Sequence, residues 1–231
     1  MGGDIANLST PGYRAQTVTF APYRNLALSA VDGGNATPLG SIAGGGVVSA
    51  TTTDWNTGPL QSSGSPLAVA INGPGFFGVQ TPAGVEYTRA GDFSFNASGT
   101  LVTPDGYPVL STTGGPLQVS SPHAAAIASI NASGHLVSGG QVVGQVAVFA
   151  PSVATLGTEA QSLFQLSAGS APPAQITPNL NPGFVEGSNV DLVAEMASLM
   201  RLDQAFASDQ TAVQTAQQTM TTAISQVGKV S

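Results

Sequence analysis

Residues 188–227 read SNVDLVAEMASLMRLDQAFASDQTAVQTAQQTMTTAISQV, and this stretch decides the C-terminal part of the fold. No proline interrupts it, so a continuous helix is predicted over residues 189–227. At 1.5 Å per residue that helix is on the order of 55 Å long. A domain of about 150 residues has a radius of gyration of roughly 15 Å, so such a helix extends beyond the domain it belongs to.

Both ends of the predicted helix carry recognisable signals. Ser188 and Asp191 have the spacing of a capping box, so the helix is expected to start there. Asp191 and Glu195 lie near its positive end, and Gly228 with Lys229 suits its termination.

An apolar residue recurs in this helix at every seventh position, as in the a column of a heptad repeat. The d column is only partly apolar, so a tight two-stranded zipper is not specified. A wider stripe, to which Met200 also belongs, predicts packing against several helices of other chains. The alternative left open is that the stripe packs on its own domain. The predicted assembly interface consists of Leu192, Met196, Leu199, Leu202, Phe206, Val213, Met220, Ile224 and Val227.

The rest of the chain divides into two regions that precede the helical segment at 186–231. Residues 66–185 contain short apolar runs bounded by Gly, Pro, Asn or Asp, which predicts a β domain. Within it, residues 96–102 (NASGTLV) are echoed by residues 131–137 (NASGHLV), and each copy is expected to form a hairpin turn. Residues 1–65 are rich in Gly, Ser and Thr and predict extended chain and loop, without a helix of useful length. The fold class expected is therefore mainly β with a long C-terminal α-helix.

Composition argues against several classes of partner. Charged residues make up 7% of the chain, where about 25% is typical, and the net charge is −7. The five basic residues are scattered, so no stripe is available to neutralise nucleic-acid phosphates. The chain has no cysteine, no window of 18 apolar residues and no leader-like N-terminus, so neither disulfides, a membrane span nor a cleaved signal is expected.

No catalytic, cofactor-binding or metal site is predicted. Residues 73–78 (GPGFFG) match a dinucleotide-binding pattern, but a strand is expected after them in place of the required helix. His123 and His135 lack acidic partners at metal or triad spacing, and a paired-carboxylate glycosidase site has no positive support. The aromatic residues around Trp55 and Tyr87 are expected in a core, with a carbohydrate groove as the alternative.

Several short blocks, spread over nearly the whole chain, carry a family resemblance. They are residues 5–14 (IANLSTPGYR), 65–73 (SPLAVAING), 75–77 (GFF), 87–93 (YTRAGDF), 101–103 (LVT), 106–110 (GYPVL), 186–191 (EGSNVD) and 195–196 (EM). In this order they resemble the signatures of the flagellar rod and hook proteins of bacteria. The signature positions at the two chain ends are Ala6, Asn7, Pro11, Gly12, Tyr13, Ser188, Asn189 and Val190.

The resemblance implies a structural subunit of the basal-body rod, of the FlgF and FlgG type, with the proximal rod protein FlgF favoured. It implies helices from both chain ends that polymerise around the flagellar axis, a β domain outside them, and a shaft that transmits torque across the periplasm. The implied partners are copies of the chain and other rod and hook axial proteins, with no nucleic acid and no membrane insertion. Export would follow the flagellar type III pathway without a cleaved signal peptide.

The sequence also departs from the family pattern. Ala68 stands where the family usually has Asp, and residues 203–207 (DQAFA) lack an Arg and an acid that the family usually carries. The family has a longer amphipathic helix before the Ala6-Asn7 signature than this sequence contains. A secreted β-rich binding module or adhesin with a coiled-coil tail is the alternative function, although it would not explain both terminal signatures.

Overall fold

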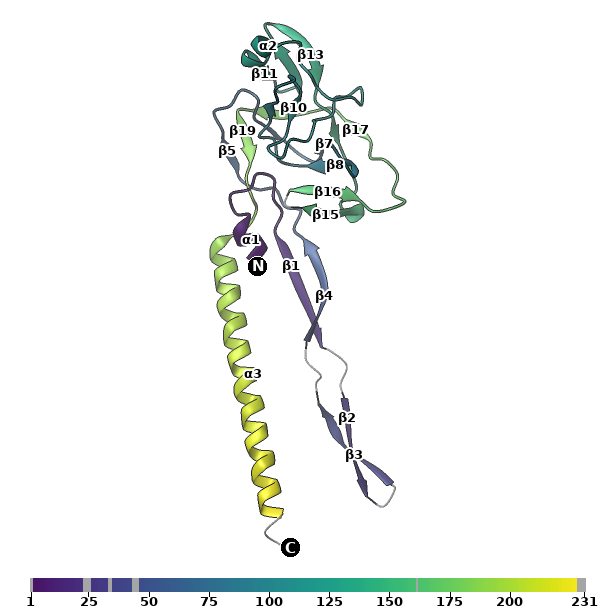
Figure 1. Ribbon diagram of the computed structural model, residues 1–231, viewed down its shortest axis with the longest axis vertical. Coiled ribbons are helices and arrows are strands. Elements are labelled where there is room, and N and C mark those ends of the chain that lie inside the picture. Colours follow the sequence, from purple (N-terminus) through teal and green to yellow (C-terminus); the bar gives the residue numbers. More distant parts are fainter. Residues whose placement is uncertain (1, 23–25, 33–34, 43–45, 161, 228–231) are drawn as a thin grey trace.

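The computed structural model of the chain describes residues 2–22, 26–32, 35–42, 46–160 and 162–227. Over these residues the fold is mainly β with one long C-terminal helix, as the sequence predicts. Figure 1 shows three parts: a β domain, a two-stranded arm and the helix α3. The arm and α3 both extend from the same end of the β domain.

The β domain is built around a six-stranded antiparallel sheet in the order β15-β16-β8-β7-β14-β17. Its strands are β7 (Phe76–Thr81), β8 (Gly84–Thr88), β14 (Val148–Phe149), β15 (Leu156–Ala160), β16 (Leu163–Leu166) and β17 (Gln175–Ile176). Strands β11 (Ala128–Ile130), β12 (His135–Ser138) and β13 (Gln141–Gln145) form a second antiparallel sheet, which follows the short helix α2 (Pro122–Ala126). A single 3-10 turn among the described residues, η1 (Val153–Thr155), precedes β15.

Three short strand pairs complete the β domain. They are β9 (Ser94–Phe95) with β10 (Leu101–Val102), β6 (Val69–Ile71) with β18 (Leu180–Pro182), and β5 (Leu60–Ser62) with β19 (Phe184–Glu186). The last pair joins residues on either side of the boundaries expected at 65/66 and 185/186. Those domain boundaries stay a prediction. The β5–β19 pair joins residues of the expected N-terminal region to residues at the end of the expected β domain.

The two echoed segments form the same turn, as predicted. The side-chain oxygen of Asn96 accepts from the backbone N–H groups of Ser98 (3.0 Å) and Thr100 (2.9 Å). Asn131 repeats this with Ser133 (3.0 Å) and His135 (2.9 Å). In each copy the fourth residue is a glycine at φ 76°, a left-handed conformation that favours glycine. One turn closes the β9–β10 hairpin and the other the β11–β12 hairpin.

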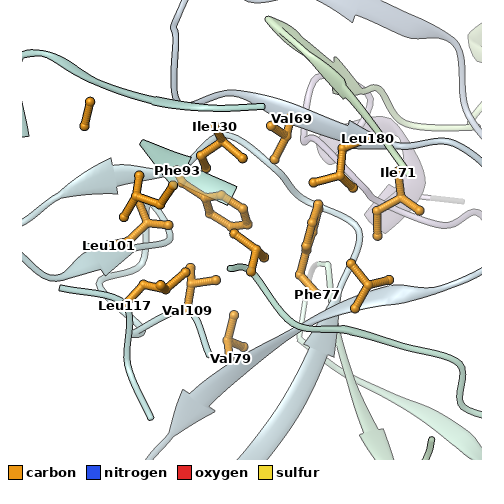
Figure 2. Packing of buried hydrophobic residues seen from close by; sticks show 14 of the residues in the cluster. Val69, Ile71, Phe77, Val79, Phe93, Leu101, Val109, Leu117, Ile130 and Leu180 are labelled. Atoms are coloured by element: carbon orange, nitrogen blue, oxygen red, sulfur yellow. The ribbon is translucent and has the colours of Figure 1, made fainter. Parts of the chain in front are cut away.

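Apolar side chains from both halves of the β domain fill one main core (Figure 2). Phe77 and Phe93 meet edge to face with ring centroids 5.1 Å apart, and Val69, Leu101 and Leu180 pack into the same cluster. Full burial of each such side chain contributes about 1.5–3 kcal/mol. Because Leu180 lies in β18, this core binds the returning C-terminal chain to the β domain.

The aromatic residues weighed for a carbohydrate groove lie in or against the core. Tyr87 and Phe93 are buried, and Phe95 and Tyr107 are partly buried against the main cluster. Trp55 packs on the rings of Phe76 and Phe164 in a second, smaller cluster. The core interpretation is therefore supported for Tyr87, Phe93, Phe95 and Tyr107, whereas Trp55 is half-buried and also borders a cavity.

The N-terminal region was expected to be extended chain without strand pairing, but it forms a two-stranded β arm. After the one-turn helix α1 (Gly2–Ala6), strand β1 (Gln16–Pro22) pairs antiparallel with β4 (Gly46–Thr53). Further out, β2 (Leu26–Asp32) pairs with β3 (Asn35–Ile42). The extended conformation was predicted, and the pairing across the arm was not.

Helix α3 (Leu192–Val227) contains 36 residues and starts later than its capping signal indicated. The side chain of Asp191 accepts from the backbone N–H groups of Val193 (2.9 Å) and Ala194 (3.2 Å), so Asp191 is the N-cap. The predicted start at Ser188 is wrong: its hydroxyl accepts from the N–H of Val190, 3.3 Å away. The residues before Asp191 stay non-helical because hydrogen bonds hold them to the N-terminal segment. None of the helices in the described part of the chain has both the length and the apolarity that crossing a bilayer requires.

Gly91 provides a test of the close packing in the β domain. A Cβ at this position would overlap the carbonyl oxygen of Val69, whereas a Cβ at Gly115 meets nothing within 4 Å. We expect Gly91→Ala to destabilise the chain by about 1–3 kcal/mol, because the backbone of β6 must move. Gly115→Ala should change stability by less than about 1 kcal/mol. Urea unfolding followed by circular dichroism measures both, and equal midpoints would contradict the described contact.

Candidate assembly interface

Segments from the two ends of the described chain meet in what we call the terminal junction, residues 4–15 and 186–191. The N–H of Gly12 donates to the carbonyl of Glu186 (2.8 Å), and the N–H of Asn189 donates to that of Tyr13 (3.4 Å). The Asn189 side chain accepts from the N–H of Ala15 (2.7 Å) and donates to two carbonyls in residues 54–56 (2.9 Å each). One amide thus connects the N-terminal segment, the end of the arm and the entry to α3.

A tight turn shapes the N-terminal side of the junction. The N–H of Tyr13 donates to the carbonyl of Thr10 (3.3 Å), with Pro11 and a left-handed Gly12 (φ 70°) between them. Proline followed by glycine at these positions is typical of a type II turn. A Cβ at Gly12 would overlap the backbone of Arg89 and Ala90, so only glycine lets the turn lie against that segment.

The phenol of Tyr13 secures the turn to α1. Its hydroxyl donates to Oδ1 of the buried Asp4 (2.9 Å), which also accepts from the N–H of Gln16 (3.1 Å). Burial, followed by the hydrogen bond to Asp4, raises the pKa of Tyr13 to about 12. The phenol therefore stays protonated, as its role as a donor requires.

A buried ion triad lies behind the turn. Glu186 accepts from Nη2 of Arg14 (2.6 Å) and from Nη1 of Arg89 (3.0 Å), and the side chains of the three residues are 1–6% exposed. Oε1 of Glu186 also accepts from the N–H of Gly58 (3.0 Å), and Arg89 donates to the carbonyl of Gly73 (2.9 Å). Burial lowers the pKa of Arg89, and the charge of Glu186 opposes this shift.

The structure places the predicted site residues in two separate sets. Ala6, Asn7, Pro11, Gly12, Tyr13, Ser188, Asn189 and Val190 all lie in the terminal junction or border it. The heptad residues lie on α3, where Leu192, Met196, Leu202, Phe206 and Val213 are exposed and Leu199 is half-buried. The side chains of Met220, Ile224 and Val227 lie outside the described part of the structure. That the α3 face forms an interface stays a prediction.

Sequence reasoning missed the roles of Arg14, Arg89 and Glu186. The five basic residues were considered scattered in the sequence. Two of them, however, lie inside the signature blocks IANLSTPGYR and YTRAGDF. The signal that was available is that so weakly charged a chain places an arginine in each of two signature blocks that are otherwise poor in charge. Glu186 begins a third block, EGSNVD. Only the fold shows that the three blocks converge.

The glycine-rich segment and the histidines that were considered as possible binding or catalytic sites show no such site in the described structure. Residues 73–75 connect strand β6 to strand β7, so no helix opens on this glycine-rich segment. His135 is half-buried in β12, and the side chain of His123 lies outside the described residues. Within the part of the chain that the structure describes, no three His, Cys, Asp or Glu side chains gather as metal ligands.

The triad predicts a large effect for loss of one charge. Glu186→Gln leaves two buried guanidinium groups without a counter-charge, and removal of one partner of a buried ion pair costs about 3–5 kcal/mol. Asp203→Asn, at an exposed position on α3, is the control and should stay within about 0.5 kcal/mol of the parent chain. Urea unfolding measures both changes.

A second variant separates the effect of uncompensated charge in the triad from the effect of changed side-chain shape. If uncompensated charge causes the loss, a triple replacement by apolar residues (Arg14→Met, Arg89→Met, Glu186→Leu) should destabilise the chain less than Glu186→Gln alone. A Glu186→Gln variant as stable as the Asp203→Asn control would contradict this account of the junction.

Comparison with known proteins agrees with the family resemblance. Residues 70–138 match the family model of the flagellar hook protein FlgE/F/G D1 domain, and residues 181–226 match that of the flagellar basal body rod FlgEFG protein C-terminal region. The chain is 32% identical to the flagellar basal-body rod protein FlgG of Bacillus subtilis, over 90% of this chain and 85% of that relative. It is 27% identical to the FlgF of Caulobacter vibrioides, over 100% of this chain and 91% of the relative.

The FlgG of Caulobacter vibrioides is also 32% identical to the chain, over 94% of this chain and 88% of the relative. Relatives of both names match at similar levels, so the preference for FlgF stays a prediction. The matches to these three relatives extend over 90–100% of the chain. The chain belongs to the family of flagellar basal-body rod proteins of the FlgF and FlgG type.

Proposed function

We propose that the chain is a structural subunit of the rod that self-assembles through the apolar face of α3 and so helps form a torque-transmitting axial shaft. The observation that supports this most directly is the exposure of that face: Phe206 is 64% and Val213 is 57% exposed. Monomeric soluble proteins rarely expose contiguous apolar surface of this kind, which favours an interaction site.

The position of α3 strengthens the proposal. It contacts α1 near its own N-terminal end, and beyond that its length extends away from the β domain (Figure 1). Long helices draw most of their stability from the packing of an apolar face rather than from intrinsic propensity. In a single copy the described outer part of α3 lacks such packing, which neighbouring subunits would supply.

The remaining surface of α3 also suits burial among other chains. Residues 210–227 contain no charged side chain. The hydroxyls of Thr211, Thr215 and Thr219 donate to the carbonyl four residues earlier, at 2.9 Å each. Because these donors are already satisfied within the helix, they can be buried against another helix without leaving a hydrogen bond unmade.

The partners and location follow from the family. We propose that copies of the chain and other rod and hook axial proteins contact α3, without nucleic acid and without membrane insertion. The relatives are named basal-body rod proteins, which supports a location in the flagellar basal body. Export without a cleaved signal peptide is part of the same proposal, as is the absence of catalytic activity.

Two charges on the apolar face test the assembly role. Phe206→Asp with Val213→Asp would place carboxylates in the proposed seam, at a cost of several kcal/mol if they remain unpaired. We expect rod incorporation and motility to be lost when the two substitutions are made in the chromosomal gene. The urea midpoint of the purified monomer should hardly change, because both side chains are exposed there.

The matched control adds two carboxylates that are also seven residues apart, as Ala197→Asp with Gln204→Asp, where both residues are exposed, lie off the heptad column and precede the uncharged segment 210–227. The control should retain motility. A large loss of monomer stability in the Phe206/Val213 variant, with motility restored by overexpression, would show that α3 packs mainly on its own chain and would refute the proposal.

A further inference from the structure

A cavity of about 250 Å³ adjoins the ion triad. Arg14 and Arg89 contribute to its lining, and Trp55, Phe76 and Pro151 are among the aromatic and apolar residues that enclose it. The guanidinium carbon of Arg89 lies 5.1 Å from the ring centroid of Phe76. The cavity therefore combines a cationic side with apolar walls.

Arg14 and Arg89 have more N–H donors than there are acceptor atoms bonded to them in the described structure. A guanidinium carries five N–H donors in a fixed fork. In the structure Nε and Nη1 of Arg14 and Nε of Arg89 are buried without a hydrogen-bond partner among the described residues. Buried donors left unpaired are unfavourable, and more so when they are charged. These nitrogens have almost no accessible surface, so an acceptor in the cavity would pair with them once the guanidinium groups turn toward it, and that pairing would recover the energy.

The charges of the triad do not cancel. Two guanidinium groups face one carboxylate, Glu186, so the cluster carries one net positive charge with side chains 1–6% exposed. A monoanion would neutralise it, whereas a dianion such as phosphate would leave a net negative charge between apolar walls. Carboxylates also match the fork geometry of arginine.

We infer that this cavity is a carboxylate-binding site, and that its occupant is an Asp or Glu side chain exposed on a second copy of the chain. Charge complementarity supports the choice, because the chain carries 12 acidic and 5 basic residues. Of the three basic residues that the structure describes, two line the cavity and the third, Arg201, lies exposed on α3. Acidic side chains outnumber basic ones on each copy, and this cavity supplies a cationic partner for one of them. The choice of a second copy as occupant rests on the proposed self-assembly, whereas carboxylate binding by the cavity does not.

The single tryptophan of the chain makes the site directly observable. Trp55 lines the cavity, so its emission reports on what enters. Sodium propionate, which reproduces the end of a Glu side chain, should change the Trp55 emission of the monomeric protein saturably. Sodium chloride at matched ionic strength should not. Equal responses to propionate and chloride would overturn the inference.

Substitution at the cavity mouth localises the binding without disturbing the triad, since Arg89→Gln could simply unfold the chain. Val153 lines the cavity and is 46% exposed. A carboxylate tethered there in Val153→Glu should compete and weaken propionate binding about tenfold relative to its matched control, Val153→Gln. Identical titrations of the two variants would place the bound propionate elsewhere and refute the site.

Measuring self-association tests whether the bound carboxylate belongs to a second copy of the chain. Sedimentation velocity of the concentrated protein should show weaker association in propionate than in chloride, and weaker association for Val153→Glu than for Val153→Gln. Propionate binding that leaves self-association unchanged would refute a second copy as the occupant. The Phe206→Asp, Val213→Asp variant should still bind propionate, so failure of the assembly proposal and failure of this site give different results.

Discussion

The buried carboxylate of Glu186 joins segments that lie far apart in the sequence. It binds Arg14 from the N-terminal segment, Arg89 from the segment after β8 and the backbone of Gly58 near the end of the arm. These three groups lie 172, 97 and 128 residues from Glu186 along the chain. Since an ion pair held in a dry site tolerates little displacement, the triad fixes how the arm, the β domain and α3 meet.

This constraint divides the chain into a fixed part and a part left available. The β domain and terminal junction contain the apolar cores and the buried ion triad. Helix α3 leaves the junction in a set direction but keeps a large apolar face exposed. Such a division suits a building block, because neighbouring copies can add packing to α3 without reorganising the domain that orients it.

The sequence predicted the elements better than their connections. The heptad column and the Asn-x-x-Gly turns are local patterns, so the long helix and both hairpins could be read from residues 192–227, 96–99 and 131–134. The start of α3 was misplaced because Asn189 donates its backbone N–H to the carbonyl of Tyr13 and accepts from the N–H of Ala15, and these long-range hydrogen bonds override the local capping signal. The Arg14–Glu186–Arg89 triad was missed because no local pattern reports which distant segments converge.

We infer that α3 is fixed at its N-terminal end and lacks packing partners along its length until other subunits cover it. Hydrogen exchange measured by mass spectrometry on the monomer and on assembled rods tests it most directly. We expect rapid exchange over residues 206–227 in the monomer, slow exchange at the terminal junction in both states, and strong protection of 206–227 only in the rod. Exchange over residues 206–227 that is as slow in the monomer as in the β core would contradict it.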